Sequence, residues 1–377
     1  MYKKTYKYRL YPTKAQQTEM QKTLDACRWV YNKTLEVRKT AWKERKENVS
    51  YYDTVKMLPE WKQDNPSLTC VYAQSLGEVC RRVDLAFKAF FRRCKNKKNP
   101  GYPRFKSFDR YDSFTYPQNG FMLLKKQLKL FKIGLVKIRK HRDIDGKIKT
   151  LTIRRTATSK WYAYFSCEVE PKPLPKVSPI AGIDVGLESF ATFSNGEKIE
   201  NPRFFKKNEK SLAKAQRKLF KQKKGSSERK KAKKVVAHIH EKIVNKRRDF
   251  AHKASRAIVN NYQVIAFEKL NIKQMRENGF KNIRKSIGDV AWNRFMEFTH
   301  YKAVEAGREF VQVDPRNTTK MCSRCRQLVE KKLSDRIHKC PYCGLTLDRD
   351  INAAINILAR GLSCLDLVLE APVSAGE

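Results

Sequence analysis

Two pairs of cysteines near the C-terminal end constrain the fold of this chain more than any other feature. Each pair has the spacing Cys-x-x-Cys, and fourteen residues separate the two pairs. The four cysteines are Cys322, Cys325, Cys340 and Cys343. Each tight turn supplies two thiolates to a tetrahedral ion, so we expect a structural zinc ribbon with no open coordination position. Redox thiols or core residues are the alternative, and the equal spacing with Gly344 after the second pair favours zinc.

Other cysteines and histidines give no second ligand set. The remaining cysteines are Cys27, Cys70, Cys80, Cys94, Cys167 and Cys364, and their scattered positions are typical of small apolar core residues. His338 lies inside the predicted ribbon, and because four cysteines already complete a tetrahedron, we expect this histidine at the surface. His238, His240 and His252 fall in basic helical sequence, where nucleophilic or acid–base roles are not expected.

The charge of the chain indicates a polyanionic partner. The 377 residues suffice for two or three domains. The 82 Lys and Arg residues against 38 Asp and Glu residues give a net charge of +44. A small excess is only a solvated surface, but an excess this large repels itself unless polyanions neutralise it, so we expect extensive phosphate contact.

The sequence gives no sign of a membrane. It contains no run of about 18 apolar residues, and its first residues have no signal-peptide core. We therefore expect a cytosolic protein, in the prokaryotic cytosol or nucleoid, with no membrane partner and no obligate protein partner.

The N-terminal half reads as a β module interrupted by helices. Residues 1–12 alternate, and Thr13 with Gln16 forms a capping box at the start of a helix. Helical spacing then links Met20, Leu24, Cys27 and Tyr31, and later Val83, Phe87, Phe90 and Phe91. These phenylalanines are more typical of a core than of a base-stacking surface. Alternation returns from Phe114 to Val169, with Asp145-Gly146 as a hairpin turn signal.

The C-terminal half reads as an α/β unit. A stiff proline-rich linker covers 171–179, and a strand carrying Asp184 runs on towards Phe193 before a hairpin turn at 194–196. Two basic antiparallel helices are expected over 205–260. Strands follow at 264–267 and 310–313, and the final helix over 347–361 stops at Gly361. Residues 362–377 are expected to form a flexible tail.

Three acidic residues occupy the ends of elements in this unit. Asp184 lies in a short apolar strand, Glu268 follows another strand and is expected at the sheet edge, and Asp350 opens the final helix. Asp348 is a candidate cap of that helix, whose apolar face is expected to include Ile351, Ala354, Ile355 and Leu358. Taken singly, each acid is typical of a turn or a cap. Taken together, they suit two divalent cations about 4 Å apart, Mg²⁺ or Mn²⁺, for phosphodiester hydrolysis.

With these residues in hand, the chain resembles the TnpB family of transposon-encoded RNA-guided nucleases, also called OrfB-family transposases. The resemblance covers nearly the full length. It rests on the segments 8–13, 101–106, 182–186 and 267–271, the two cysteine pairs, and 348–354. Compact type V CRISPR effectors are related to this family.

The resemblance implies a multidomain α/β plus β protein. A wedge β-barrel would comprise 1–12 and 113–170, interrupted by a helical recognition block, 13–112. After the linker, a ribonuclease-H-like RuvC nuclease domain would span 180–315 and 347–361, with the zinc ribbon, 316–346, inserted. It implies Asp184, Glu268 and Asp350 as catalytic Mg²⁺ ligands and the four cysteines as zinc ligands. Gln74, beside Tyr72 and Ala73, and Thr115, within 113–115, resemble residues that contact DNA.

The implied function is RNA-guided, Mg²⁺-dependent cleavage of double-stranded DNA next to a short transposon-adjacent motif. The guide RNA would come from the transposon end, and the basic stretch 205–248 would line the channel for the RNA–DNA heteroduplex, with a solvated helix pair as the plain alternative. A non-enzymatic RNA-guided DNA-binding repressor of the transposon is the alternative function, which the three intact acids disfavour. A strand-joining transposase ranks last, because no tyrosine nucleophile with a metal-binding histidine motif is present.

Overall fold

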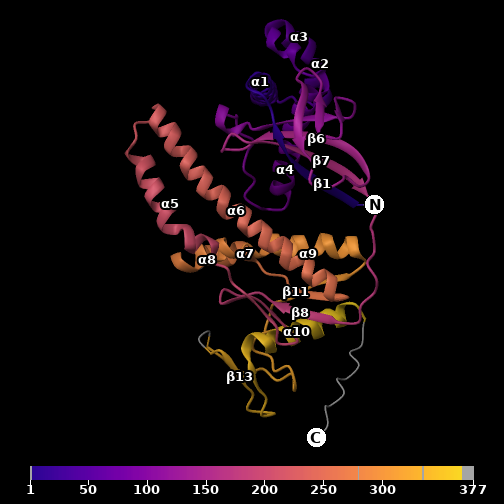
Figure 1. Ribbon diagram of the computed structural model, residues 1–377, viewed down its shortest axis with the longest axis vertical. Helices are drawn as coiled ribbons and strands as arrows, with labels where there is room; N and C mark the ends of the chain where they lie inside the picture. The colour runs from indigo at the N-terminus through magenta and orange to yellow at the C-terminus, as the bar shows by residue number, and fades with distance from the viewer. Residues whose placement is uncertain (1, 279, 333–334, 367–377) are drawn as a thin grey trace. The chain divides into compact units, whose positions relative to one another are not determined.

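The computed structural model describes residues 2–278, 280–332 and 335–366 (Figure 1). Within these ranges no helix is both long and apolar enough to span a bilayer. The tail predicted for 362–377 lies mostly outside the described residues. Internal contacts divide the chain into two compact units, Met1–Glu170 and Pro171–Glu377, which are described separately below.

The first unit is built on a seven-stranded antiparallel sheet. Its strands are β1 (Tyr2–Tyr11), β2 (Ser113–Pro117), β3 (Phe121–Leu123), β4 (Gln127–Leu130), β5 (Gly134–Arg139), β6 (Lys147–Arg155) and β7 (Trp161–Val169). They lie in the order β2-β6-β7-β1-β5-β4-β3. Only residues 118–120 connect the two end strands, β2 and β3, so the sheet curls into a nearly closed barrel.

The predicted first strand is confirmed and is central to this sheet. β1 pairs with β7 on one side and β5 on the other, although the helical block separates it from both in sequence. Tyr6, Tyr8 and Leu10 are buried on one face, as the alternation predicts. The burial of these three side chains therefore joins the N-terminal residues to strands more than a hundred positions away.

The helical block of the first unit contains four helices, α1 (Lys14–Arg45), α2 (Tyr51–Lys56), α3 (Leu58–Asp64) and α4 (Ala73–Lys95). The predicted capping box is confirmed, because the Thr13 side chain accepts from the Gln16 amide while the Gln16 side chain accepts from the Thr13 amide. Arg38 of α1 and Asp84 of α4 form a nearly buried ion pair of 3.2 Å. This pair and the apolar faces hold the two long helices together.

The predicted hairpin turn at Asp145-Gly146 is wrong in one respect. The turn exists, with Gly146 at a φ of 76°, but it joins β5 to β6, which are not neighbours in the sheet. The hairpin partner of β6 is β7, reached through residues 156–160. The dipeptide specifies a left-handed backbone, whereas strand pairing depends on which apolar faces meet.

The second unit contains a mixed five-stranded sheet. Its strands are β8 (Ile180–Asp184), β9 (Ser189–Phe193), β10 (Lys198–Glu200), β11 (Val264–Glu268) and β12 (Glu309–Val313), in the order β10-β9-β8-β11-β12. β8, β11 and β12 are parallel, whereas β9 pairs antiparallel with β8 and β10 pairs antiparallel with β9. β8 ends at Asp184 and the chain reverses into β9, so the strand does not run on to Phe193 as predicted. The turn at 194–196 joins β9 to β10, as expected.

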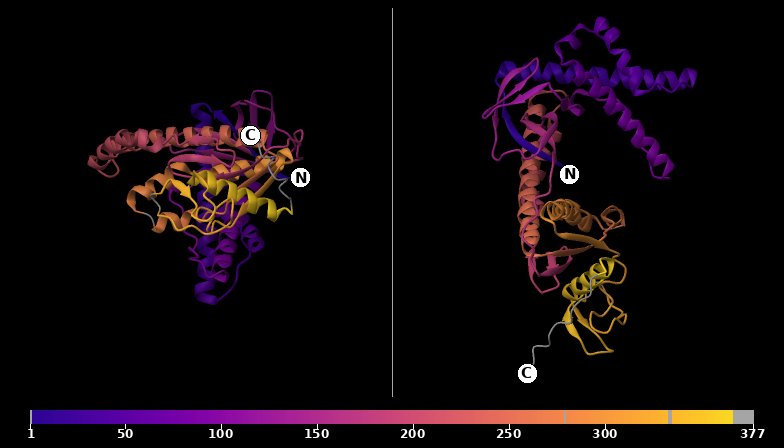
Figure 2. Two further views of the ribbon diagram at one scale, coloured as in Figure 1. Left: turned by 90° about the horizontal axis from the view of Figure 1, so that it is seen from below. Right: turned by 90° about the vertical axis from the view of Figure 1, so that its right-hand side faces the viewer.

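Helices cover both faces of this sheet. Ile265 and Phe267 of β11 pack with α6 (Ser227–Asn261) and α9 (Trp292–Ala306), whereas Val264 and Ala266 pack with α10 (Arg349–Cys364) on the other face. The long antiparallel pair α5 (Phe204–Lys221) and α6 confirms the predicted basic hairpin, and it projects well beyond the sheet (Figures 1 and 2). Two short helices, α7 (Ile272–Asn278) and α8 (Lys281–Val290), lie between β11 and α9 in sequence.

The predicted helix stop at Gly361 is wrong. α10 continues to Cys364, and Gly361 is buried inside it. A Cβ at this position would lie 2.6 Å from the Ala266 Cβ, and a Cβ at Gly182 would lie 2.1 Å from the Ala354 carbonyl oxygen. These two glycines therefore allow α10 to lie close against β8 and β11. From the sequence alone, Gly361 predicts only the end of a helix.

Candidate functional site

Asp184 and Glu268 end two neighbouring parallel strands. In the parallel register of β8 and β11, Ile183 pairs with Phe267, so the next residue of each strand is one of the two acids. Side chains at the carboxyl ends of parallel strands emerge at the same end of the sheet. Glu268 is buried at the carboxyl end of an inner strand, so the prediction that it lies at the sheet edge is wrong.

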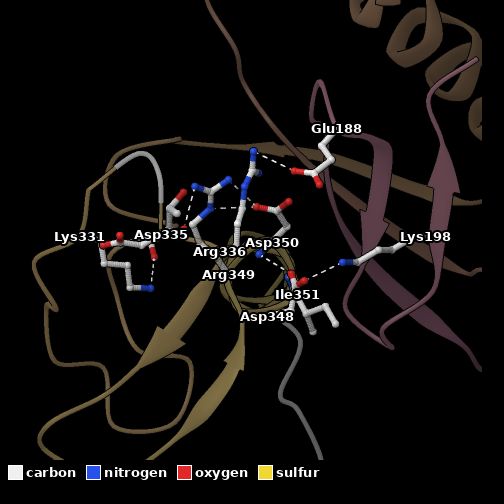
Figure 3. Close-up of polar contacts among 10 residues, drawn as sticks. Glu188, Lys198, Lys331, Asp335, Arg336, Asp348, Arg349, Asp350 and Ile351 are labelled. Carbon is white, nitrogen blue, oxygen red and sulfur yellow. Dashed lines mark hydrogen bonds and ion pairs between the residues drawn. The ribbon is translucent and has the colours of Figure 1, made fainter. Parts of the chain in front are cut away.

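Asp350 enters the same site from the first turn of α10. The Asp348 side chain caps this helix, as predicted, and accepts from the amides of Asp350 and Ile351 at 2.8 and 3.2 Å (Figure 3). Lys198 of β10 holds the other carboxylate oxygen of Asp348 at 2.7 Å. The cap fixes the start of α10 beside the sheet, and this start carries Asp350.

The three acids interact electrostatically. Burial raises the pKa of Asp184 well above its usual value, and the negative charges of Glu268 and Asp350 raise it further. Burial also raises the pKa of Glu268, while a hydrogen bond from the Thr318 hydroxyl opposes this effect. The charges of Glu268 and Asp350 therefore both act on Asp184, as expected for side chains that share one site.

Arginine 349 partly neutralises this region. Its Nε and Nη2 atoms both lie 3.0 Å from one carboxylate oxygen of Asp350, and its Nη1 atom donates to the Asp335 carbonyl of the ribbon at 3.1 Å (Figure 3). The positive charge of Arg349 also lowers the pKa of Asp184. Oxygen ligands with unneutralised negative charge suit Mg²⁺ or Mn²⁺, so the donor set fits these ions.

The four cysteines form a much tighter group. Their sulfur atoms lie within 4.8 Å of one another, and the pairs Cys322–Cys343 and Cys325–Cys340 are each 3.6 Å apart. Across the described residues this is the one group of three or more potential ligands with such spacing, and the three carboxylates are further apart. Four thiolates at this spacing suit one tetrahedral zinc ion.

The predictions for the other histidine and cysteines need correction. His338 is fully buried, not at the surface, and lies on β13 (Ile337–Lys339), which pairs with β14 (Thr346–Asp348). Its ring contacts the Lys331 ammonium, and burial together with this charge lowers the pKa of His338. Of the six scattered cysteines, Cys27, Cys80 and Cys167 are buried as predicted, whereas Cys70, Cys94 and Cys364 are exposed.

Two asparagines of α10 connect the ribbon to the carboxylate site. Asn352 and Asn356 are fully buried. The Asn352 amide oxygen accepts from the Ser323 amide at 2.9 Å, and both side chains donate to the Met321 carbonyl. Asn356 also donates to the Thr318 carbonyl at 2.9 Å. The first cysteine turn is thereby fixed to the helix that carries Asp350.

Sequence reasoning missed these asparagines. The predicted apolar face of α10 includes Ile351 and Ile355, but these side chains are only partly buried. The buried face instead combines Ala354, Leu358 and the two asparagines. A polar pair four positions apart on an otherwise apolar helix was the available signal, because buried amides require partners.

A cleft of about 400 Å³ opens beside the loop that follows Asp184. It is lined by Leu187, Glu188, Asn201, Arg203, Lys206, Ser286, Asp289 and Arg336. Arg336 of the ribbon forms a 2.8 Å ion pair with Glu188 (Figure 3). Asp289 accepts from the Phe205 amide at 2.9 Å and from Arg247 at 2.6 Å, which fixes the start of α5 to α6 and α8.

The two residues expected to contact DNA belong to the first unit. Gln74 is exposed in the first turn of α4. Thr115 on β2 is buried, and its hydroxyl accepts from Arg82 at 2.7 Å and lies 2.9 Å from the Thr152 hydroxyl. The Thr115 hydroxyl therefore already has internal partners, and the Gln74 side chain faces solvent.

Comparison with protein families gives three matches. Residues 164–279 match the OrfB_IS605 model, described as a probable transposase, and residues 292–357 match the Cas12f1-like TNB domain. Residues 1–47 match a helix-turn-helix domain model. In this structure residues 2–47 form one strand, β1, and one continuous helix, α1.

Curated relatives match nearly the whole chain. A "Putative RNA-guided DNA endonuclease" of Streptomyces pristinaespiralis is 36% identical over 371 residues, covering 96% of this chain and 90% of the relative. The protein named "Putative RNA-guided DNA endonuclease InsQ" of Escherichia coli (strain K12) is 30% identical, with coverages of 96% and 94%. "TnpB-like protein L79" of Acanthamoeba polyphaga mimivirus is 25% identical, with coverages of 94% and 73%. The chain belongs to the TnpB family, which the OrfB_IS605 model represents.

Proposed function

We propose that this protein is an RNA-guided, Mg²⁺-dependent endonuclease that cleaves double-stranded DNA next to a short transposon-adjacent motif. The observation that carries the proposal is the electrostatic interaction of three acids. Burial raises the pKa of Asp184, and the charges of Glu268 and Asp350 raise it further. Carboxylates that repel one another in a buried site are retained where a cation neutralises them. The names of the relatives supply the RNA-guided part of the proposal.

The sheet order supports a RuvC-type, ribonuclease-H-like nuclease. The first strand of the unit, β8, lies in the middle of the sheet between antiparallel β9 and parallel β11, and helices cover both faces. Asp184 ends this strand, Glu268 ends the next parallel strand, and Asp350 starts the helix across them. We assign the nuclease domain to 180–315 and 347–364, the wedge barrel to 1–12 and 113–170, and the recognition block to 13–112.

Asp184, Glu268 and Asp350 would hold the catalytic Mg²⁺ ions, and the four cysteines would hold a structural zinc ion. Bound Mg²⁺ activates the attacking water and neutralises charge on the phosphate that is cleaved. Asp348 orients the helix start behind Asp350, and Thr318 keeps the Glu268 carboxylate oriented. Arg349 holds Asp350 while the site is without its cations, because it neutralises the carboxylate charge.

The cleft beside the loop that follows Asp184 is the proposed path of the DNA strand. Arg203, Lys206 and Arg336 are exposed on it and would contact phosphates. The basic hairpin, α5 and α6, would contact the heteroduplex through its backbone, so that base pairing with the guide RNA carries the sequence information. Gln74 would contact the transposon-adjacent motif. Thr115 would act there through its hydrogen bond with Arg82.

The proposal is tested by cleavage of a matched double-stranded target with guide-loaded protein. We expect cleavage in Mg²⁺ or Mn²⁺ and none in EDTA. Asp184→Asn should reduce the rate by at least about 10³-fold while guide RNA and target DNA remain bound. Asp249→Asn, which changes an exposed acid of α6 in the same unit, is the matched control and should cleave normally.

Two results would contradict the proposal. Full cleavage by Asp184→Asn would remove this carboxylate from the active site. Guide-dependent DNA binding by the unchanged protein with no cleavage at any Mg²⁺ or Mn²⁺ concentration would instead assign a non-enzymatic RNA-guided repressor.

A further inference from the structure

Four aromatic rings form a cluster at the C-terminal end of α4. The cluster consists of Phe87, Phe90 and Phe91 of α4 and Tyr102 of the following loop. Tyr102 meets Phe87 and Phe90 edge-to-face at centroid distances of 5.7 and 5.3 Å, and Phe91 lies 5.2 Å from Phe90. These rings therefore form one continuous aromatic surface.

Only part of this cluster belongs to the core. Phe87 is buried, with the Arg38 guanidinium 4.6 Å from its ring centroid. Phe91 is 59% exposed and Tyr102 is 44% exposed. The prediction that Phe91 is a core residue is therefore wrong, because helical spacing fixes the side of a helix but not how far its neighbours extend along it. The cluster therefore has two solvent-exposed rings, Phe91 and Tyr102, beside the buried ring of Phe87.

The loop that carries Tyr102 is held in place on both sides. Arg93 of α4 donates to the Pro100 carbonyl at 2.9 Å. On the other side, the Asn32 side chain of α1 accepts from the Lys106 amide at 2.8 Å and donates to the Lys106 carbonyl at 3.1 Å. The exposed rings are thus fixed before any ligand arrives, which lowers the entropy lost on binding.

The charge around the cluster selects an anionic ligand. Residues 85–108 contain no Asp or Glu and eight Lys or Arg residues. The eight are Lys88, Arg92, Arg93, Lys95, Lys97, Lys98, Arg104 and Lys106. A protein partner would need a matching acidic and apolar face, whereas a single-stranded nucleic acid supplies phosphates and flat apolar bases at every nucleotide.

We propose that Phe91 and Tyr102 form a stacking site for unpaired bases of the guide RNA. This inference rests on the proposed function for the identity of the RNA. A guide RNA stays bound as a constituent of the complex, so it covers the exposed rings continuously, whereas a displaced DNA strand would cover them only briefly. Exposed apolar surface on a free protein favours aggregation. A ligand that stays bound, such as the guide RNA, is therefore favoured over a DNA strand that binds only briefly. Unpaired RNA bases stack on aromatic side chains in the same way in many RNA-binding domains.

The first experiment measures binding of single-stranded oligouridylate and of a duplex RNA of equal length to the full chain, in EDTA and without DNA. Phe91→Ala and Tyr102→Ala should each weaken binding of the single strand by about 5- to 150-fold, and the double variant should weaken it further. It should leave duplex binding and the salt dependence unchanged, because no phosphate contact is removed. Leu85→Ala, at a residue of α4 that is 53% exposed, is the matched control and should bind normally.

Phe91→Leu separates stacking from simple apolar contact. This variant keeps apolar area but loses the ring, so it should weaken single-strand binding nearly as much as Phe91→Ala, while Phe91→Trp should retain it. Wild-type affinity in Phe91→Leu, or an equal loss of single-strand and duplex binding in the double variant, would overturn the stacking site. Circular dichroism of each variant checks that the fold is intact.

Ultraviolet cross-linking of the RNA-loaded full-length protein, with and without bound target DNA, identifies the ligand directly. We expect adducts between Phe91 or Tyr102 and nucleotides of the copurified RNA. Adducts only to the displaced DNA strand, or capture of a protein in place of RNA, would overturn the assignment to guide RNA. None of these measurements needs cleavage, so an inactive nuclease would contradict the proposed function and leave this inference intact.

Discussion

The four cysteines and the three carboxylates are the two proposed ligand sets of the second unit, but the chain assembles them in opposite ways. The cysteine sulfurs come from two short turns and already lie within 4.8 Å of one another. The carboxylates come from β8, β11 and α10 and are more widely spaced, and burial followed by the charges of Glu268 and Asp350 raises the pKa of Asp184.

This difference follows from charge and sequence distance. Neutral thiols approach one another without repulsion, and a Cys-x-x-Cys turn fixes each pair locally. Three carboxylates repel, and only the packing of α10 across two strands holds them in one region. The ribbon therefore stabilises itself once zinc is bound, whereas the carboxylate site depends on the rest of the unit, including the ribbon that is fixed to α10 by Asn352 and Asn356.

Loss of zinc should have the largest effect. Cys340→Ser should release the ion and unfold the ribbon, because zinc binding in such small sites contributes about 10–16 kcal/mol. Cleavage should fall with it, since the first cysteine turn supports the helix that carries Asp350. Zinc content by mass spectrometry and limited proteolysis measure the two effects. Cys364→Ser, at an exposed cysteine outside the ribbon, is the control, and full activity of zinc-free Cys340→Ser would show that the sites are independent.

The link between the two sites is tested by Asn356→Ala. This change removes the donor to the buried Thr318 carbonyl and one of the two donors to the Met321 carbonyl, and it should cost about 1–3 kcal/mol in the free energy of unfolding. Zinc should remain bound while the cleavage rate falls, because the start of α10 loses its support. Chemical denaturation and cleavage assays measure the two quantities. Equal activity in Asn356→Ala and the unchanged protein would refute a positioning role.

Removal of the buried and repelled charge of Asp184 should stabilise the cation-free protein. Since the pKa of Asp184 is raised in the folded state, the unfolded chain loses its proton first, and the free energy of unfolding from this group falls as pH rises above the usual value near 3.8. In EDTA at neutral pH, Asp184→Asn should therefore gain about 1 kcal/mol. Thermal unfolding at pH 4 and pH 7 measures it. A lower stability of the variant at pH 7 would contradict a raised pKa of Asp184 in the folded state.

The smallest effect is expected at the partner of Glu268. Thr318 donates to the Glu268 carboxylate and lowers its pKa, so Thr318→Val should raise that pKa. The carboxylate then requires a higher pH, and the acid limb of the cleavage profile should move upward by less than about one pH unit. Thr319→Val, at the next position in sequence, is the control. An unchanged or downward-shifted limb in Thr318→Val would contradict the assignment of Glu268.

Local signals in the sequence were sufficient for several elements. The alternation of Tyr6, Tyr8 and Leu10 predicts β1, and the Thr13–Gln16 box predicts the start of α1, because both depend on neighbouring residues. The cysteine spacing predicts a group that the structure contains. The same signals failed for Asp145-Gly146 and Gly361, because strand pairing and close helix packing depend on residues far away in the chain.

The sequence by itself determined the identities of the acids and thiols, their order along the chain, and a charge that requires a polyanion. Only the tertiary structure decided that Glu268 and Asp350 interact electrostatically with Asp184. It also decided that Asn356 joins the ribbon to α10 and that Phe91 faces solvent. The physical reason is the sequence separation over which each interaction acts. Turns and caps depend on interactions within a few residues, whereas burial and electrostatic repulsion depend on which distant segments the packed core brings together.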